Sequence, residues 1–146
     1  VATGTVYNYF KSKDEMIAGI MLQDWSKTVD DMKNAVTNVS MDSDDPQREF
    51  SNGMVSVTMS IRNFNRKHAI TFGQFEEASG SLNIVQKYHH LLRDQIDNIL
   101  LNLIENTGNT NLRAVIPVLS ETILTVSQRD DIDNIMIREF AEIISA

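Results

Sequence analysis

The sequence predicts an all-α fold, and three observations support this prediction. Apolar residues recur at spacings of three and four along most of the chain, which is the periodicity of one helix face and not the alternation of a strand. Only two Pro and six Gly interrupt this pattern in 146 residues. Apolar residues make up 42% and charged residues 23%, so the chain has the length and composition of one domain with a buried core. We expect about six helices.

The first long helix should begin at Lys13. Ser12 and Glu15 have the spacing of a capping box, in which each side chain accepts a hydrogen bond from the backbone amide of the other residue. The apolar stripe of this helix drifts round its axis, so its first turns should face a different neighbour from its later turns. The polar segment 42–46 should end the helix, with Pro46 in the first turn of the next one.

Two further helices are expected in the middle of the chain, with a shorter one between them. The first has apolar residues at spacings of four, three, four and three: Phe50, Met54, Val57, Ile61 and Phe64. A bend is expected over 63–68, followed by a short helix with Ala69, Phe72 and Phe75 on one side and a break at 79–81. The strongest helical pattern runs from 84 to 103 and should stop at Gly108.

The last two helices should cover 112–126 and 132–143. Pro117 lies in the first of them, so that helix should be kinked or should start late. Asp130 or Asp131 is expected to cap the second. Together they carry more apolar residues than one buried stripe needs, which predicts a homodimer closed as a four-helix bundle. The stripes are Ile116, Leu119, Ile123 and Val126, and Ile132, Ile135, Met136, Phe140 and Ile143, with Ile137 and Ile144 outside the second stripe.

Charge and composition exclude several classes of protein. Twenty acidic residues against thirteen basic ones leave a net charge of −7, so the chain as a whole is not a nucleic-acid-binding module. The absence of Cys excludes disulfide scaffolds, thiolate zinc sites and cysteine nucleophiles, and it fits a reducing compartment. No apolar run approaches the ~18 residues of a membrane span, and the first residues do not have the pattern of a secretion signal. We therefore expect a cytoplasmic protein that has no contact with a membrane.

The titratable residues do not form a pattern typical of catalysis or metal binding. His89 and His90 are adjacent and would point about 100° apart on a helix, and neither Glu-x-x-His nor His-Glu-x-x-His occurs. We expect these histidines and His68 at the surface or at the rim of a pocket. Glu76 and Glu77 fit a solvated face better than a paired-carboxylate site, and one of them would otherwise balance a cationic ligand. We predict no enzyme, no metal and no cofactor.

The first sixteen residues carry the one motif that points to a family. Gly4-Thr5-Val6-Tyr7-Asn8-Tyr9-Phe10, followed by Ser12-Lys13-Asp14-Glu15, resembles the recognition helix and following helix of the TetR family of bacterial transcriptional regulators. The resemblance implies that 1–11 is the remnant of a helix-turn-helix and that 12–146 is a ligand-binding and dimerisation domain. It also implies that the first two helices of the DNA-binding domain lie before Val1, in a longer parent protein.

The resemblance assigns a role to each matched residue. Thr3 and Thr5 would face the DNA groove, Gly4 would let the backbone approach it, and Val6 and Phe10 would be core. The phosphate-contacting residues would be Tyr7, Tyr9 and Lys13. The chain departs from the family at Ala2, where Ser or Thr usually caps the recognition helix, a loss worth roughly 1 kcal/mol. There is no Arg or Lys within 1–10 for bidentate base recognition.

The resemblance also places a ligand pocket among the middle helices. Met and aromatic side chains make adaptable apolar walls, and although each of these residues taken alone is better explained as core, some of the set should line a cavity. The candidates are Met21, Trp25, Met54, Phe64, Phe72, Phe75 and Tyr88.

The function implied is that of a ligand-responsive repressor. A small, mostly apolar molecule would release operator DNA by changing the spacing of the two recognition helices in a dimer of the parent protein. The alternative is an all-helical protein-interaction module without a ligand cavity.

Overall fold

The computed structural model describes residues 13–38, 44–69 and 82–146, and within these ranges the chain is all-helical. The five α-helices and the short 3-10 helix are α2 (Lys13–Thr37), α3 (Pro46–Lys67), α5 (Leu82–Thr107), η1 (Thr110–Val115), α6 (Ile116–Ser127) and α7 (Asn134–Ser145). The expectation of an all-α fold is confirmed. None of these helices is long and apolar enough to cross a membrane.

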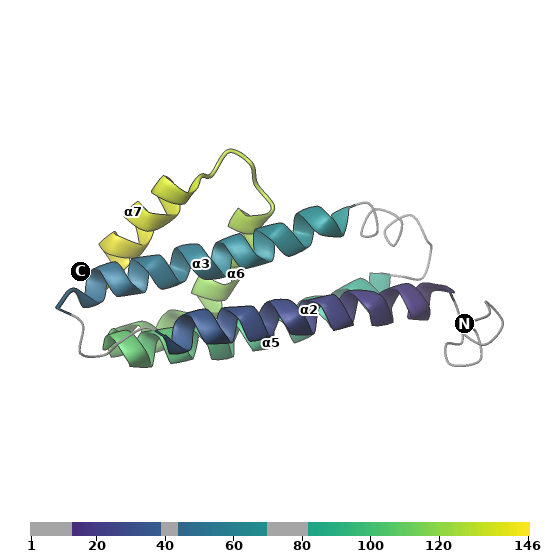
Figure 1. Cartoon of the computed structure of the whole chain (residues 1–146), viewed down its shortest axis with the longest axis horizontal. Coiled ribbons are helices and arrows are strands. Elements are labelled where there is room, and N and C mark those ends of the chain that lie inside the picture. The colour runs from purple at the N-terminus through teal and green to yellow at the C-terminus, as the bar shows by residue number, and fades with distance from the viewer. Residues whose placement is uncertain (1–12, 39–43, 70–81) are drawn as a thin grey trace.

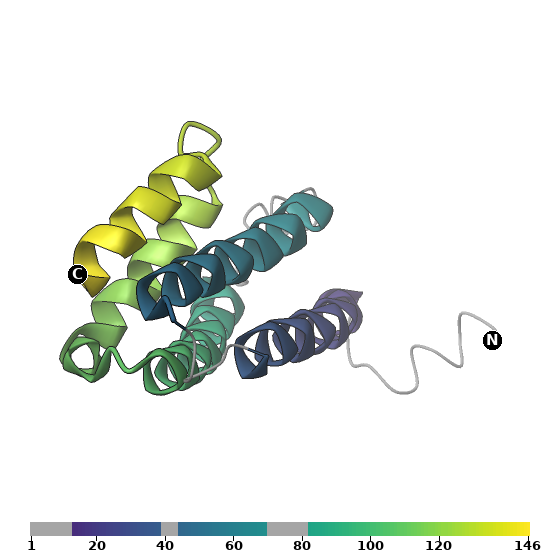
Figure 2. The ribbon, with the colours of Figure 1, turned by 60° about the vertical axis from the view of Figure 1, so that its left-hand side comes forward.

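Helix α3 lies at the centre of the arrangement. It contacts α2 and α5, which run alongside it, and it also contacts α6 and α7 (Figures 1 and 2). Helix α7 packs mainly on α3, so the last two helices are joined through α3 more than through each other. Any shift of α3 is therefore felt by every other α-helix in the described part of the chain.

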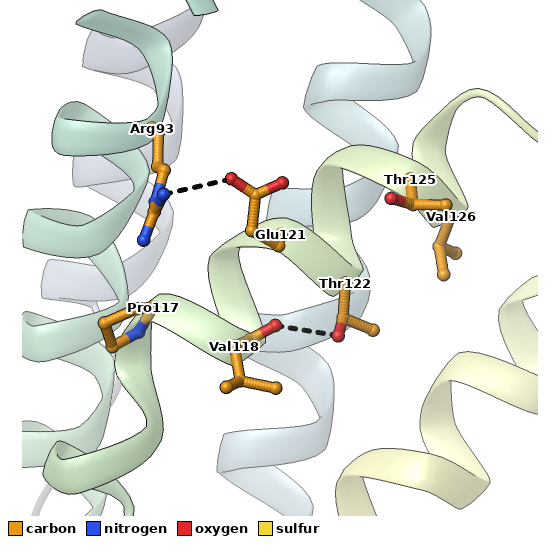
Figure 3. Close-up of a pocket in the computed structure, with 7 residues that line it drawn as sticks. All are labelled: Arg93, Pro117, Val118, Glu121, Thr122, Thr125 and Val126. Atoms are coloured by element: carbon orange, nitrogen blue, oxygen red, sulfur yellow. Dashed lines mark hydrogen bonds and ion pairs between the residues drawn. The ribbon is translucent and has the colours of Figure 1, made fainter. Parts of the chain in front are cut away.

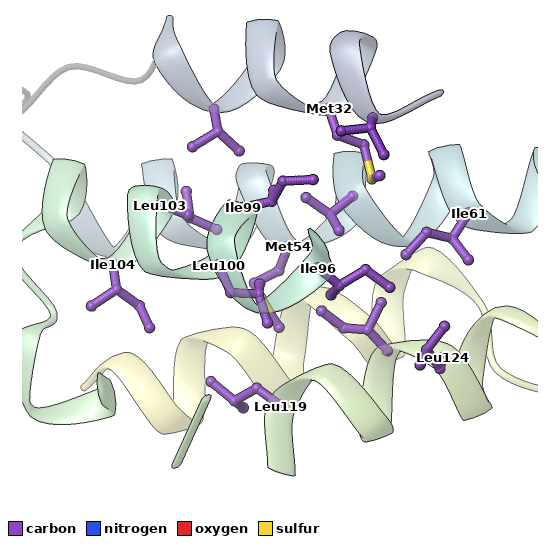
Figure 4. Close-up of a cluster of buried hydrophobic side chains, with 14 of the residues drawn as sticks. Met32, Met54, Ile61, Ile96, Ile99, Leu100, Leu103, Ile104, Leu119 and Leu124 are labelled. Carbon is purple, nitrogen blue, oxygen red and sulfur yellow. The ribbon is translucent and has the colours of Figure 1, made fainter. Parts of the chain in front are cut away.

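The hydrophobic core lies where these helices meet. All five apolar residues of the predicted α3 stripe are buried, from Phe50 to Phe64. They pack with buried residues of α2, α5, α6 and α7, several of which are drawn in Figure 4. The spacing of three and four along α3 therefore identified its buried face correctly.

Most helix boundaries follow the local chemistry that predicts them. Helix α3 begins at Pro46, and Asp45 caps it by accepting a hydrogen bond from the Arg48 amide at 3.0 Å. Helix α5 ends at Thr107, and Gly108 follows with φ 77°, a left-handed conformation that residues other than glycine rarely adopt. Of the two alternatives at Pro117, the late start is the one observed, because Pro117 lies in the first turn of α6.

Two predicted boundaries are wrong. Helix α3 does not bend over 63–67 but remains helical to Lys67, and His68 ends it by donating its amide to the Phe64 carbonyl at 3.1 Å. The cap of α7 is Asp133, which accepts from the Met136 amide at 2.9 Å, and not Asp130 or Asp131. Those two carboxylates lie in ion pairs with Arg66 and Arg129. The expected short helix with Phe72 and Phe75, and the cap at Ser12, lie outside the described residues.

Candidate functional site

The most distinctive side chains of the described core meet where the end of α3 faces α2 and α5. We call this group the junction cluster. Its members are Asp24, Trp25, Phe64, Lys67, His68 and Gln95. The cluster joins three helices through aromatic and polar contacts, whereas the rest of the core is mostly aliphatic.

The aromatic part of the cluster is packed edge to face. Trp25 is 1% exposed, and its ring lies 5.0 Å from that of Phe64 at an interplanar angle of 68°. The Phe64 ring lies 4.7 Å from the His68 imidazole. The indole N–H of Trp25 donates to the side-chain oxygen of Gln95 on α5, which satisfies a donor that would be costly to bury alone. These contacts hold α2 in one position against α3 and α5.

The polar part of the cluster is built on the carboxylate of Asp24. Its Oδ2 accepts from Lys67 Nζ at 2.9 Å and lies 3.0 Å from His68 Nε2. The hydrogen bond from Lys67 is the main reason why the pKa of Asp24 lies below its ordinary value, and His68 acts in the same direction. An ionised carboxylate only accepts hydrogen bonds, so His68 Nε2 carries the proton. His68 is 7% exposed and Asp24 is 30% exposed, so this contact ties α2 to α3 at the edge of the core.

The structure brings only some of the predicted pocket residues together. Trp25 and Phe64 are in contact, and Met21 lies half-buried one turn before Trp25 on α2. Met54 is buried ten residues before Phe64, about 15 Å away along α3, so one small ligand would not touch both. Phe72, Phe75 and the Tyr88 side chain lie outside the described part of the chain.

The residues that resemble a DNA-contacting segment are not described in three dimensions. Thr3, Gly4, Thr5, Tyr7 and Tyr9 precede the first described residue. Lys13 is the first residue of α2, although its side chain is not described. Along the chain, α2 directly follows this segment, and Trp25 lies about 18 Å along the helix from Lys13.

The sequence did not single out half of the cluster. Asp24, Lys67 and Gln95 were not among the candidates, and His68 was expected at the surface or a pocket rim. The contacts that define their roles join residues 44 and 70 positions apart. The only local signal was the position of Trp25 on the apolar stripe of α2, and it does not specify a partner.

A second feature is an open groove between α5 and α6, with a volume of about 500 Å³. Arg93 of α5 and Glu121 of α6 form an ion pair at 3.3 Å on one wall, as Figure 3 shows. The remaining lining residues are Pro117, Val118, Thr122, Thr125 and Val126. No residue predicted to bind a ligand lines this groove, and it is distinct from the junction cluster.

A third feature is the outer face of α7, which we define as Ile135, Met136, Phe140 and Ile143. All four are exposed, Ile135 by 71% and Ile143 by 72%. The exposed Glu139 lies on the same side. The opposite side of α7 buries Ile137 and Ala141 in the monomer, so these four apolar residues are not needed to hold the helix on α3.

The predicted stripes of the last two helices are thus divided between core and surface. On α6, Leu119 and Ile123 are buried in the monomer, and Ile116 packs partly buried against the same core. The exposed apolar residues near the start of α6 are Val115 and Val118. Ile132 precedes α7 and lies in the turn between the two helices.

Comparisons with known proteins do not assign the chain to a family. No family model, no curated protein and no solved structure is significantly similar to it. Among the described residues, no group of three or more His, Asp or Glu side chains is arranged to hold a metal ion.

Proposed function

We propose that this chain is the regulatory part of a ligand-responsive transcriptional regulator of the TetR type. A small, mostly apolar molecule binds at the junction cluster and changes the position of α2. Helix α2 follows the segment that resembles a recognition helix, so its position sets the position of that segment. The observation that carries the proposal is that Asp24 and Trp25 of α2 are held by the buried Phe64 and His68 of α3 and by the partly buried Gln95 of α5.

The chemistry of the cluster suits control by a ligand. Ligand sites combine aromatic walls with a few placed polar groups, and Trp25, Phe64, His68 and Gln95 provide both. A molecule that stacks on Trp25 or hydrogen-bonds to His68 competes with the contacts that hold α2. Such a molecule binds more tightly to a conformation in which α2 has moved than to the conformation in which those contacts are formed. This difference in affinity shifts the population toward the moved conformation.

A second copy of the chain is part of the proposal. Regulators with a helix-turn-helix read two half-sites at a fixed separation, which requires a dimer. The outer face of α7 supports this part, because a row of exposed apolar side chains either finds a partner or stays in water. A change in the position of α2 in both copies would change the separation of the two recognition helices.

The ligand site is tested with the fluorescent apolar anion 8-anilinonaphthalene-1-sulfonate. Trp25 is the only Trp in the chain, so it is the only indole donor for energy transfer to the bound probe. Because energy transfer does not require contact, the comparison of variants decides whether the probe lies at the junction cluster. We expect saturable transfer that is lost in His68→Ala and retained in Ile143→Glu, a change on α7. Probe binding without transfer from Trp25 would contradict a ligand site at the cluster, and native mass spectrometry checks for a co-purified molecule.

The dimer is tested by sedimentation velocity at micromolar concentration. We expect the unmodified chain to be a dimer and the double variant Phe140→Glu, Ile143→Lys to be monomeric. Asn98→Glu adds a charge at an exposed position of α5 and should leave the dimer intact. A monomeric unmodified chain would contradict the dimer and the mechanism based on helix spacing.

The alternative function is a helical interaction module without a ligand cavity. The observation that favours it is that Trp25, Met54 and Phe64 are buried as ordinary members of the core. This alternative expects no transfer that is lost in His68→Ala and no co-purified small molecule. The fluorescence titration therefore separates the two functions.

A further inference from the structure

The last two turns of α3 contact two different parts of the protein on opposite sides. Phe64, Lys67 and His68 face α2 in the junction cluster. Arg62 and Asn65 form a second set, and they face the end of α6 and the turn that leads to α7. Because each residue turns an α-helix by about 100°, the mean directions of the two sets differ by roughly 140° within about 10 Å of helix.

Arg62 makes the main contact on the second side. Its Nη2 donates to the backbone carbonyls of Val126 at 3.0 Å, Arg129 at 3.2 Å and Ile132 at 2.7 Å. The Val126 carbonyl lies in the last turn of α6, where it also accepts from the Arg129 amide at 3.1 Å, and the other two carbonyls lie in the segment that leads to α7. The C-terminal end of a helix carries partial negative charge, which favours a cation there. Arg62 is 6% exposed, so these carbonyls stabilise its charge in a place shielded from water, while its buried Nε has no hydrogen-bond partner among the described residues.

Two neighbours of Arg62 strengthen the same connection. Asn65 Nδ2 donates to Ser127 Oγ at 3.2 Å, and Ser127 is itself buried at the end of α6. Arg66 pairs with Asp130 at 3.6 Å, but both side chains are exposed and the pair contributes little. Arg62 and Asn65 therefore set the direction in which the chain leaves α6 and enters α7.

We propose that Arg62 is a positioning residue that couples the junction cluster to the outer face of α7. A ligand that moves α2 also shifts the end of α3, and Arg62 transmits this shift to the turn at 128–133. Ligand binding then changes the affinity for the second copy, and the second copy changes the affinity for the ligand by the same factor. The binding of a ligand and of a second copy rests on the proposed function. The coupling between the two ends of α3 is a property of one chain.

The first experiment changes the α6–α7 side and observes the α2 side. Arg62→Met and the milder Asn65→Ala remove contacts to the turn, and neither residue is among the described contacts of Trp25. We expect both variants of the full chain to increase acrylamide quenching of Trp25. Arg62→Lys keeps a charge and three donors, so it should restore the protection of Trp25.

The matched control is Arg138→Met. It breaks the hydrogen bond from Arg138 of α7 to Asn52 of α3, which joins α7 to α3 far from the junction cluster. This variant should leave the quenching of Trp25 unchanged. Faster hydrogen exchange at 128–133 in Asn65→Ala would show that the turn has been loosened. If the quenching of Trp25 were then unchanged, the coupling would be overturned. Equal quenching in all variants, the control included, would overturn it too.

The second experiment runs in the opposite direction. Asp24→Asn weakens the α2 side, and we expect it to increase the hydrogen-exchange rates of 128–133 and to change the dimer dissociation constant by about 2- to 30-fold. In the double variant Asp24→Asn, Asn65→Ala, the fold-change in the exchange rates of 128–133 should be smaller than the product of the two single fold-changes, because the two residues act through the same helix end. Independent effects would overturn the coupling. A monomeric chain would contradict the proposed dimer, while the exchange rates would still decide whether the coupling exists.

Discussion

Replacing Gly53 with Ala should destabilise the protein, although Ala is the better helix former. Gly53 is buried in α3 where this helix crosses α5. A Cβ atom at Gly53 would lie 2.8 Å from Leu103 Cδ2 and closer still to Leu103 Cδ1, distances that real Cβ atoms essentially never show. The close atoms are the methyl ends of the Leu103 side chain, which is fully buried, so Leu103 must move within a close-packed core to accommodate the new methyl group.

The sign of the change in unfolding free energy follows from two opposing effects, helix propensity and overpacking of the core. Gly to Ala in a helix interior gains about 1 kcal/mol of unfolding free energy. Overpacking a close-packed core costs about 1–3 kcal/mol, and two overlapping methyl contacts place this site in the upper part of that range. The net loss is therefore about 1–2 kcal/mol, which lowers the melting temperature by roughly 3–7 °C for a chain of this size.

The measurement is chemical denaturation followed by Trp25 fluorescence. Ser56→Ala is the matched control, because Ser56 is exposed on the same helix and should gain a few tenths of a kcal/mol or stay unchanged. Leu103→Val removes the Cδ atoms, so the double variant should be more stable than the sum of the single changes predicts. A Gly53→Ala variant as stable as the unmodified protein would refute the close approach of α3 and α5.

Three further predictions concern charge, capping and DNA. Because the pKa of Asp24 is lowered in the fold, its contribution to stability is present above the ordinary value of 3.8 and is lost as the pH falls through the lowered pKa. Asp24→Asn should therefore reduce stability at pH 7 and flatten its decline in acid, and parallel pH curves for the two proteins would contradict this. Asp133→Ala removes the cap of α7 and should lower the free energy of unfolding by about 1 kcal/mol, whereas Asp130→Ala should have almost no effect. The isolated chain, with its net charge of −7, should give no sequence-selective gel shift with DNA, and a selective shift would contradict the role given to residues 1–11.

Helix positions were largely predictable from the sequence, because helix ends depend on residues within one turn. Pro46 and Pro117 lie in first turns, and Gly108 follows the end of α5 in the left-handed conformation that the sequence pattern predicted. The buried face of α3 was predicted correctly for the same reason, since a spacing of three and four defines one side of a helix. The cap of α7 was not, because three aspartates compete within four residues, and ion pairs with Arg66 and Arg129 engage two of them.

The partners of these faces were decided only by the tertiary structure. A buried stripe specifies which side of a helix leaves water, but hydrophobic burial is non-directional and does not specify the neighbouring helix. The pairing of Asp24 with His68, of Trp25 with Gln95 and of Arg62 with the end of α6 joins segments 44 to 70 residues apart. These contacts form because the packing of the whole core brings the segments together, and no local property of the sequence encodes them.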